Sequence, residues 1–328
     1  MKNKPFLLKP CGKDYLWGGT RLRDDFSKDI DITPFAEAWE CSTHPDGQST
    51  VASGKDEGKL LGDVLKEHPE YLGTHPSDEY GIPILIKFID AKSDLSVQVH
   101  PSDEYAREHE NGQLGKTEMW YVLDAKPGTK LVYGFYRDIE KENLRKYLED
   151  GSIEKYLQKV DVKKNDIFFI TPGTVHAIGG GALIAEIQES SNLTYRMYDY
   201  NRTDKNGKKR ALHIDKALEV ANLTASSKPR QPMRVLKYKP GFASELLSRC
   251  KYFQVERLLI NTERLRSMYS FHTESNSFEV YVCVDGCGTI TDEDGDLINF
   301  FKGDTIFVPA NSQEIKIHGQ VQFLKVNC

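Results

Sequence analysis

The sequence predicts a mainly β protein whose strands form two tandem barrels, with short helical insertions in the N-terminal half. Runs of β-branched and aromatic residues recur along the 328 residues and are separated by Gly, Pro, Asn and Asp. This pattern is typical of strands joined by turns. Helical periodicity is rarer, and it falls between the predicted strands of the first 225 residues. Many short strands with few helices favour a sandwich or barrel architecture.

The elements of the N-terminal half follow from these patterns. The predicted strands are Pro83–Asp90, Leu95–His100, Glu118–Leu123, Lys130–Phe135, Ile167–Thr171, Leu183–Gln188 and Leu193–Tyr198. The predicted helical segments are Leu60–Tyr71, Asp103–Glu110, Glu140–Leu148, Ile153–Val160 and Ile214–Ala221. Within Glu140–Leu148, the apolar side chains share one helical face and the charged side chains share the other, as expected for a surface helix.

A change in composition near residue 230 predicts a domain boundary. Thr224–Arg234 is rich in Ser, Pro and basic residues and has no apolar periodicity, which is typical of a linker. We therefore expect one domain over residues 1–230 and an all-β unit over 231–328. The strands predicted in this unit are Phe253–Ile260, Ser267–Phe271, Phe278–Val284, Gly288–Thr291, Thr305–Val308, Glu314–Ile317 and Gln320–Val326, with a turn between Cys283 and Cys287.

The two halves contain similar motifs. Glu118-Met-Trp-Tyr-Val-Leu-Asp124 aligns with Glu279-Val-Tyr-Val-Cys-Val-Asp285, so that Glu and Asp match at the same separation. Asn165–Pro172 resembles Gly303–Pro309, which is one residue shorter. A strand that begins with Glu, followed by a turn, a Gly-Asp pair, another strand and Pro, is typical of a cupin jelly roll. Duplication is the simplest explanation, and it predicts tandem cupin-like jelly-roll barrels.

The composition excludes several classes of protein. Lys and Arg number 44 against 49 Asp and Glu, and the net charge of −5 argues against broad nucleic-acid binding. The longest apolar runs are far shorter than the roughly 20 residues that cross a bilayer, and no apolar stretch near the N-terminus suits a signal peptide. The six scattered cysteines suit reduced thiols. We expect a cytoplasmic monomer or weak homodimer that binds neither nucleic acid nor membrane.

Four side chains in the N-terminal half suit a divalent metal. Gln98 and His100 are two residues apart on one predicted strand, so their side chains leave the same face. Glu118 opens another strand, and His176 follows the corner after Thr171. Two imidazoles, a carboxylate and an amide oxygen suit Zn²⁺ and leave room for a water or substrate oxygen. Each residue alone also has an ordinary structural explanation, so it is their combination that indicates a metal site.

The C-terminal repeat lacks this combination. Gln313 stands where the first repeat has His176, and His272 precedes Glu279 by only seven residues. We therefore expect one metal ion per chain, in the N-terminal barrel, and a structural role for the second barrel.

Charged side chains also interrupt apolar strands of the first barrel. Lys87, Lys116 and Arg196 are cations in or beside strands, and Glu186 lies on a neighbouring strand, where it could also be a salt-bridge partner. Three cations in this setting indicate an anionic ligand, for which Arg offers a planar pair of donors and Lys a point charge. The cluster Lys205–Arg210, by contrast, is expected to be a solvated turn.

Several motifs resemble those of type I mannose-6-phosphate isomerases. They are Tyr15-Leu-Trp-Gly-Gly19, the segment Pro83–Pro101 with Ser-Val-Gln-Val-His-Pro, Lys116-Thr-Glu-Met-Trp120 and Pro172-Gly-Thr-Val-His-Ala177. The resemblance runs through most of residues 5–225, whereas the last hundred residues resemble the family only in being cupin-like. A large helical insertion of longer members is absent, so the chain looks like the compact bacterial form.

The resemblance implies specific roles. Gln98, His100, Glu118 and His176 correspond to zinc ligands, Arg196 to an active-site arginine, and Trp17, Lys87, Lys116 and Glu186 to pocket positions. The implied reaction interconverts mannose 6-phosphate and fructose 6-phosphate by moving a proton between C2 and C1 through a cis-enediol or enediolate. Glu186 and Lys116 are both candidates for carrying that proton. Two alternatives stay open, namely a cupin oxygenase that holds Fe(II) through His100, Glu118 and His176, and a non-catalytic sugar-binding cupin.

Overall fold

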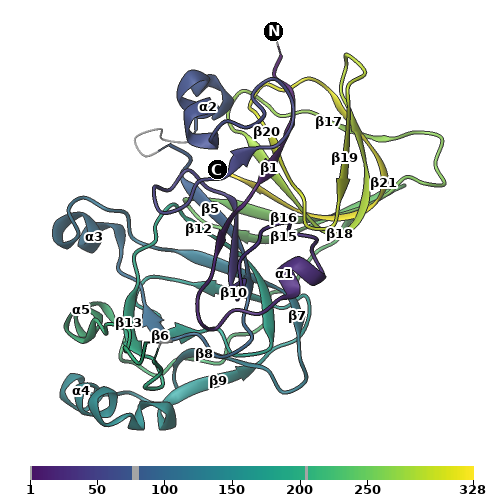
Figure 1. The fold of residues 1–328 in the computed structure, drawn as a ribbon. Coiled ribbons are helices and arrows are strands. Elements are labelled where there is room, and N and C mark those ends of the chain that lie inside the picture. The colour runs from purple at the N-terminus through teal and green to yellow at the C-terminus, as the bar shows by residue number, and fades with distance from the viewer. Residues whose placement is uncertain (1, 76–80, 204–205) are drawn as a thin grey trace.

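The fold is mainly β, as predicted, and its strands form two units that lie one above the other (Figure 1). The computed structural model describes residues 2–75, 81–203 and 206–328. Within these residues, the strands belong to a six-stranded, a five-stranded and a ten-stranded sheet. No helix in the described part of the chain is both long enough and apolar enough to span a bilayer.

The six- and five-stranded sheets form the unit that carries the predicted site. In sheet order, the first contains β10 (Ile167–Ile170), β7 (Glu118–Ala125), β12 (Ala182–Glu189), β5 (Ile84–Asp90), β3 (Glu37–Cys41) and β2 (Cys11–Lys13). The second contains β13 (Tyr195–Tyr198), β6 (Val97–Val99), β11 (His176–Ala177), β8 (Lys130–Phe135) and β9 (Leu157–Asp161). Apolar side chains of both sheets, among them Trp120 and Leu131, share one buried core, so the two sheets pack face to face.

The ten-stranded sheet combines the C-terminal strands with two strands from the start of the chain. Its main path is β14 (Lys237–Lys239), β15 (Phe242–Arg249), β16 (Gln254–Asn261), β21 (Ile315–Asn327), β18 (Glu279–Thr291), β20 (Thr305–Val308), β1 (Phe6–Lys9) and β4 (Thr50–Val51), while β17 (Tyr269–Phe271) pairs with β21 and β19 (Leu297–Phe301) pairs with β18. Phe6 of β1 pairs with Phe307 of β20, and their rings stack at 5.2 Å. The N-terminal strand thus packs into the C-terminal sheet, and the division at residue 230 stays a prediction.

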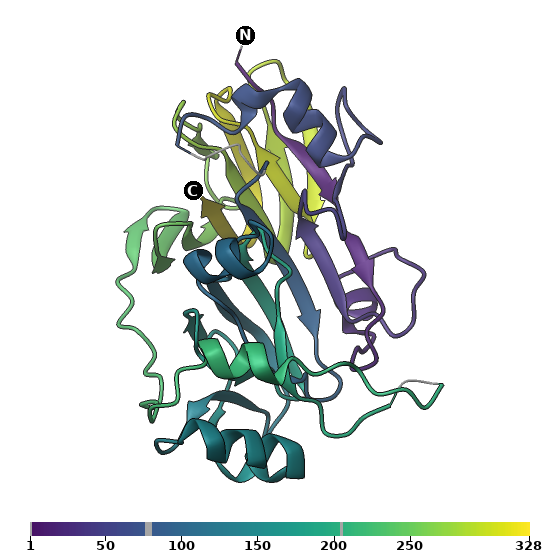
Figure 2. The ribbon, with the colours of Figure 1, turned by 90° about the vertical axis from the view of Figure 1, so that its left-hand side faces the viewer.

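The helices pack against the sheets. They are α1 (Arg21–Asp24), α2 (Leu61–Glu67), α3 (Asp103–His109), α4 (Lys141–Asp150) and α5 (Ile214–Val220), with 3₁₀ turns η1 (Pro69–Tyr71) and η2 (Ser152–Lys155). Leu144 of α4 and Leu218 of α5 join a core cluster with Val97 and Val132 of the five-stranded sheet. Figure 2 shows α3, α4 and α5 along one side of the molecule, where they cover this sheet.

The helix predicted over Ile153–Val160 is wrong. Gly151 has φ of 76° and ends α4 in the left-handed conformation, which glycine adopts without steric cost. The short turn η2 follows, and Leu157–Asp161 then forms β9. This strand pairs with β8, so that Val160 lies opposite Leu131. Sheet pairing across the chain therefore decides the conformation of a segment whose local sequence suits either state.

The turn predicted between Cys283 and Cys287 is also wrong. Both residues belong to the single strand β18, whose pairing with β21 shifts between Cys283 and Asp285. Gly286 follows this shift with φ of 81°, and a Cβ there would lie 2.0 Å from the carbonyl oxygen of Gln320. A glycine thus lets the strand bulge and continue where a turn is expected.

Candidate functional site

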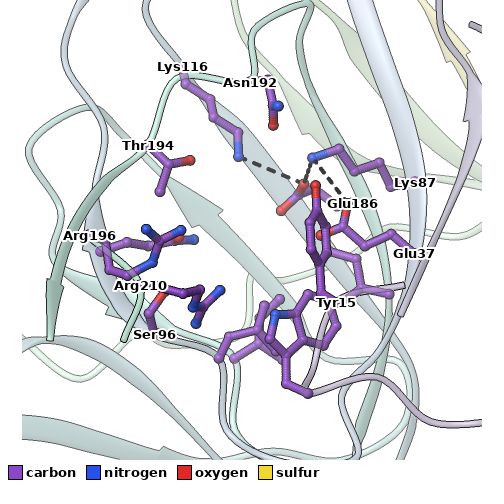
Figure 3. A pocket seen from close by; sticks show the side chains of 15 residues that line it. Tyr15, Glu37, Lys87, Ser96, Lys116, Glu186, Asn192, Thr194, Arg196 and Arg210 are labelled. Atoms are coloured by element: carbon purple, nitrogen blue, oxygen red, sulfur yellow. Dashed lines mark ion pairs between the residues drawn. The ribbon is translucent and has the colours of Figure 1, made fainter. Parts of the chain in front are cut away.

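A cavity of about 220 Å³ is lined by residues of both sheets in the N-terminal unit. Its lining is mostly polar and charged, and it comprises Tyr15, Trp17, Glu37, Lys87, Ile89, Leu95, Ser96, Gln98, Lys116, Ile178, Glu186, Asn192, Thr194, Arg196 and Arg210 (Figure 3). Trp17, Lys87, Lys116, Glu186 and Arg196, all predicted as site residues, thus meet at this cavity. Trp17 is buried beside Tyr15, with their ring centroids 5.7 Å apart.

The four predicted metal ligands also lie together. One ligand atom from each of His100, Glu118 and His176 lies within 4.8 Å of the other two, and all three residues are buried. His176 Nε2 is 3.3 Å from Oε1 of Glu118, and His100 Nε2 is 3.5 Å from Oε2. Gln98 pairs with His176 between β6 and β11, and its amide nitrogen is 3.2 Å from His176 Nε2. Rotating this amide group by a half-turn would place its oxygen, in place of its nitrogen, beside His176 Nε2.

The hydrogen bonds of the two imidazoles leave Nε2 for a metal. His100 Nδ1 lies 2.9 Å from the carbonyl oxygen of Leu193, and His176 Nδ1 lies 2.8 Å from that of Thr174. A carbonyl oxygen only accepts, so Nδ1 carries the proton and Nε2 presents its lone pair. Nε2 of His100 and Oε1 of Glu118 are buried without a hydrogen-bond partner among the described residues. Buried polar atoms rarely lack partners, so these atoms fit a bound cation.

The electrostatics of the cluster keep both histidines neutral. Burial, assisted by the charge of Lys116, lowers the pKa of His176 to about 4 and that of His100 well below its usual range. Neutral imidazoles are the form that binds metals. Burial and the nearby carboxylate of Glu186 raise the pKa of Glu118 to about 7, against the opposing effect of Lys116. The ligand set can therefore become two neutral imidazoles and one carboxylate when a cation binds.

Alternating charges extend from this cluster across the cavity. Lys116 Nζ lies 2.8 Å from Oε2 of Glu118 and 3.9 Å from Oε1 of Glu186. Lys87 Nζ is 3.1 Å from the same Glu186 oxygen and 3.9 Å from Glu37 (Figure 3). Antiparallel pairing explains this order, because Glu186 of β12 lies opposite Lys87 of β5. Burial would raise the pKa of Glu186, but the two ammonium groups outweigh it and hold this pKa at about 2.

Two arginines line the opposite side of the cavity from Lys87 and Glu37 (Figure 3). Arg196 pairs with Gln98 between β13 and β6, and its Nη1 donates to the carbonyl oxygen of Ala211 at 2.9 Å. Its Nε is buried without a partner among the described residues. Arg210 is held by two hydrogen bonds to Asp199, at 2.8 and 2.6 Å. Burial and the charge of Arg210 lower the pKa of Arg196, so this end of the cavity suits an anion.

Several lining residues are not predicted from the sequence. Arg210 belongs to the cluster predicted to be a solvated turn, yet it lines the cavity; Lys205 of that cluster lies outside the described part. Glu37 opens the buried strand β3 between Ala36 and Ala38, and a charged residue among apolar neighbours is the same signal that singled out Lys87. Tyr15 belongs to the motif that also contains Trp17. Asn192 and Thr194 follow β12 in a loop and carry no local signal.

Comparison with known proteins places the chain in a family. The family models that match are "Phosphomannose isomerase type I, catalytic domain", over residues 6–127, and "Mannose-6-phosphate isomerase, cupin domain", over residues 244–328. The second match shows that the last hundred residues resemble the family more specifically than the sequence motifs indicated.

Individual relatives agree with these matches. Mannose-6-phosphate isomerase ManA of Bacillus subtilis (strain 168) is 36% identical over 324 residues, which cover 98% of both chains. Mannose-6-phosphate isomerase of Streptococcus mutans serotype c is 43% identical over 220 residues, which cover 67% of this chain and 68% of that one. The crystal structure of mannose 6-phosphate isomerase from Bacillus subtilis has a TM-score of 0.89 at 34% identity and covers 99% of both chains. With sequence similarity and fold agreeing over nearly its whole length, the chain belongs to the type I mannose-6-phosphate isomerase family.

Proposed function

We propose that this chain interconverts mannose 6-phosphate and fructose 6-phosphate and that it uses one Zn²⁺ ion, held by Gln98, His100, Glu118 and His176. Family membership supports the isomerase activity and its substrate class. The observation that carries the metal proposal is the buried His100–Glu118–His176 cluster, whose ligand atoms lie within 4.8 Å of one another.

The donor set fits zinc well. Imidazole and carboxylate are common zinc ligands, and a site with few protein ligands keeps a coordination position open for substrate. When bound, the ion supplies a Lewis acid for the negative charge that develops on the sugar oxygens. The backbone carbonyls that hold each Nδ1 fix the direction of each Nε2, which reduces the reorganisation that binding requires.

The proton that moves between C2 and C1 needs a carrier beside the cation site. Glu186 and Lys116 both line the cavity, and Oε1 of Glu186 is 3.9 Å from Lys116 Nζ. Glu186 is ionised at neutral pH because the lysines lower its pKa, and Trp120 Nε1 donates to its other oxygen at 3.0 Å. Both residues remain candidates, and each can hold or receive a proton at an atom that faces the cavity.

The arginines suit the phosphate group. Arg196 and Arg210 present two guanidinium groups at one side of the cavity, and the buried Nε of Arg196 has no partner among the described residues. Guanidinium groups bind phosphate through paired hydrogen bonds. A substrate whose phosphate occupies this side directs its other end towards Lys87 and Glu186 across the cavity (Figure 3).

Removal of the metal tests this proposal. We expect chelated protein to lose turnover of mannose 6-phosphate in a coupled assay, and added Zn²⁺ to restore it. Turnover that survives complete metal removal, checked by elemental analysis, would contradict the metal-dependent mechanism. Oxygen consumption by the iron-loaded protein would instead support an oxygenase, and substrate binding without turnover would support a non-catalytic cupin.

A further inference from the structure

The segment that carries Lys116 is held by two buried carboxyl groups outside the cavity. The backbone N–H of Gly115 donates to Oδ1 of Asp103 at 3.0 Å, and that of Thr117 donates to Oε1 of Glu189 at 2.6 Å. The N–H of Lys116 itself donates to the carbonyl oxygen of Pro101 at 3.2 Å. Three consecutive backbone donors are therefore fixed, which leaves this segment little freedom.

Close packing restricts the segment further. A Cβ at residue 115 would lie 2.4 Å from the backbone nitrogen of Asp103 and 2.8 Å from the carbonyl oxygen of Pro101, so only glycine fits. The backbone N–H of Glu189 also donates to the carbonyl oxygen of Thr117 at 3.1 Å. This arrangement joins three places in the chain. They are the segment after His100, the segment that leads into Glu118, and the end of β12, which carries Glu186.

The C-terminal unit also contacts Asp103. Tyr252, between β15 and β16, donates its hydroxyl hydrogen to Oδ2 of Asp103 at 2.7 Å. Lys251 Nζ lies 3.4 Å from this oxygen, but its side chain is mostly exposed. Asp103 is 8% exposed and Glu189 is 1% exposed. Burial and the neighbouring Asp103 carboxylate raise the pKa of Glu189 to about 7. The charge of one carboxyl group therefore affects the ionisation of the other.

We propose that Asp103, Glu189 and Tyr252 are positioning residues that fix Lys116 in the cavity, and that Tyr252 is the route by which the C-terminal unit supports the reaction. This inference rests on the proposed function. It gives the C-terminal unit a role in positioning a residue of the active site, in addition to packing. Among the described residues, none of the three forms a hydrogen bond or ion pair with a lining side chain, and they act through the backbone of residues 115–117.

The position of the Lys116 ammonium group depends on how precisely its backbone is held. A lysine side chain has four rotatable bonds, and the position of its ammonium group depends first on where its backbone is held. Misplacing a catalytic group by about 1 Å can cost about a hundredfold in rate. Loss of the Tyr252 hydroxyl leaves one oxygen of Asp103 without its best donor, and this allows the carboxylate to turn away from Gly115.

Replacing Tyr252 by Phe tests the proposal, because this change removes only the hydroxyl group and keeps the ring in place. We expect kcat for mannose 6-phosphate to fall by roughly three- to thirtyfold while KM changes less than about twofold, since the arginine side of the cavity is untouched. Asp103→Asn, which keeps the shape of the side chain but loses one acceptor, should lower kcat at least as much. Tyr238→Phe is the matched control, because Tyr238 is 75% exposed on β14 of the same unit.

Hydrogen–deuterium exchange of the metal-loaded protein provides a readout that does not depend on activity. We expect the amides of residues 113–119 to exchange roughly tenfold faster in Tyr252→Phe and at the unchanged rate in Tyr238→Phe. Unchanged kcat together with unchanged exchange in both Tyr252→Phe and Asp103→Asn would overturn the inference. If the unsubstituted protein showed no isomerase turnover, the proposed function would fail, whereas the exchange rates would still decide whether Tyr252 fixes the segment.

Discussion

Lys116 and Glu118 form a buried ion pair, in which Nζ lies 2.8 Å from Oε2. Both side chains are at most 4% exposed, so the pair is shielded from water. The same ammonium group is 3.9 Å from Glu186, so one cation separates two buried carboxylates. Like charges repel in a buried site, and the ammonium group of Lys116 offsets part of this repulsion, which favours ionisation of both carboxyl groups.

Lys116→Met should therefore lower kcat by about 10²–10³-fold, because it removes a preorganised charge next to the reacting atoms. Steady-state kinetics with mannose 6-phosphate provide the measurement. Lys66→Met is the control, since this lysine is 80% exposed on α2 and should leave kcat unchanged. A kcat within twofold of the original for Lys116→Met would remove this residue from the reaction.

His176→Ala should reduce bound zinc from about one ion per chain to nearly none, because it removes a ligand whose Nε2 faces Glu118. Elemental analysis after dialysis measures the stoichiometry. His272→Ala is the matched control from the second unit, where the histidine is more than half exposed and its ring pairs with Glu274. Retention of zinc by His176→Ala, or two ions on the native chain, would contradict a single site in the first unit.

Zinc binding should release about one proton at pH 6 and progressively fewer as the pH rises above 7. The pKa of Glu118 is about 7 before the cation binds, so this group is mostly protonated at pH 6 and must lose its proton to become a ligand. His176, with a pKa of about 4, is already neutral and contributes none. Zinc affinity should accordingly rise with pH up to about 7 and then level off. Calorimetry in buffers of different ionisation enthalpy measures the protons released, and a release of two or more at pH 6 would show that the histidines are charged.

Arg210→Gln should raise KM for mannose 6-phosphate by roughly tenfold and weaken inhibition by inorganic phosphate to a similar degree. The change removes one of the two guanidinium groups at the arginine side of the cavity, and a charge-assisted hydrogen bond contributes about 1.5–3 kcal/mol. Arg210→Lys should recover only part of the affinity, because an ammonium group lacks the paired donors. An unchanged inhibition constant for phosphate would place the phosphate elsewhere.

Much of the N-terminal unit could be predicted from local sequence. The strand Lys130–Phe135 has the predicted bounds, and Ile84–Asp90 and Ile167–Ile170 each differ from prediction by one residue. Alternation of side chains along a strand, with a period of two, is a local property that neighbouring residues reveal directly. The same period places Gln98 and His100 on one face, and the structure brings both to the cluster with Glu118 and His176.

Other features depended on contacts between distant segments. The sequence determined many of the strands and which side chains have the chemistry to bind a metal or an anion, because those properties belong to short stretches of chain. Only the tertiary structure decided that β1 pairs with β20, that Arg210 reaches the cavity and that Tyr252 holds Asp103. These contacts join segments separated by up to about 300 residues, and the path of the intervening chain, which is set by packing of the whole core, determines which of them meet.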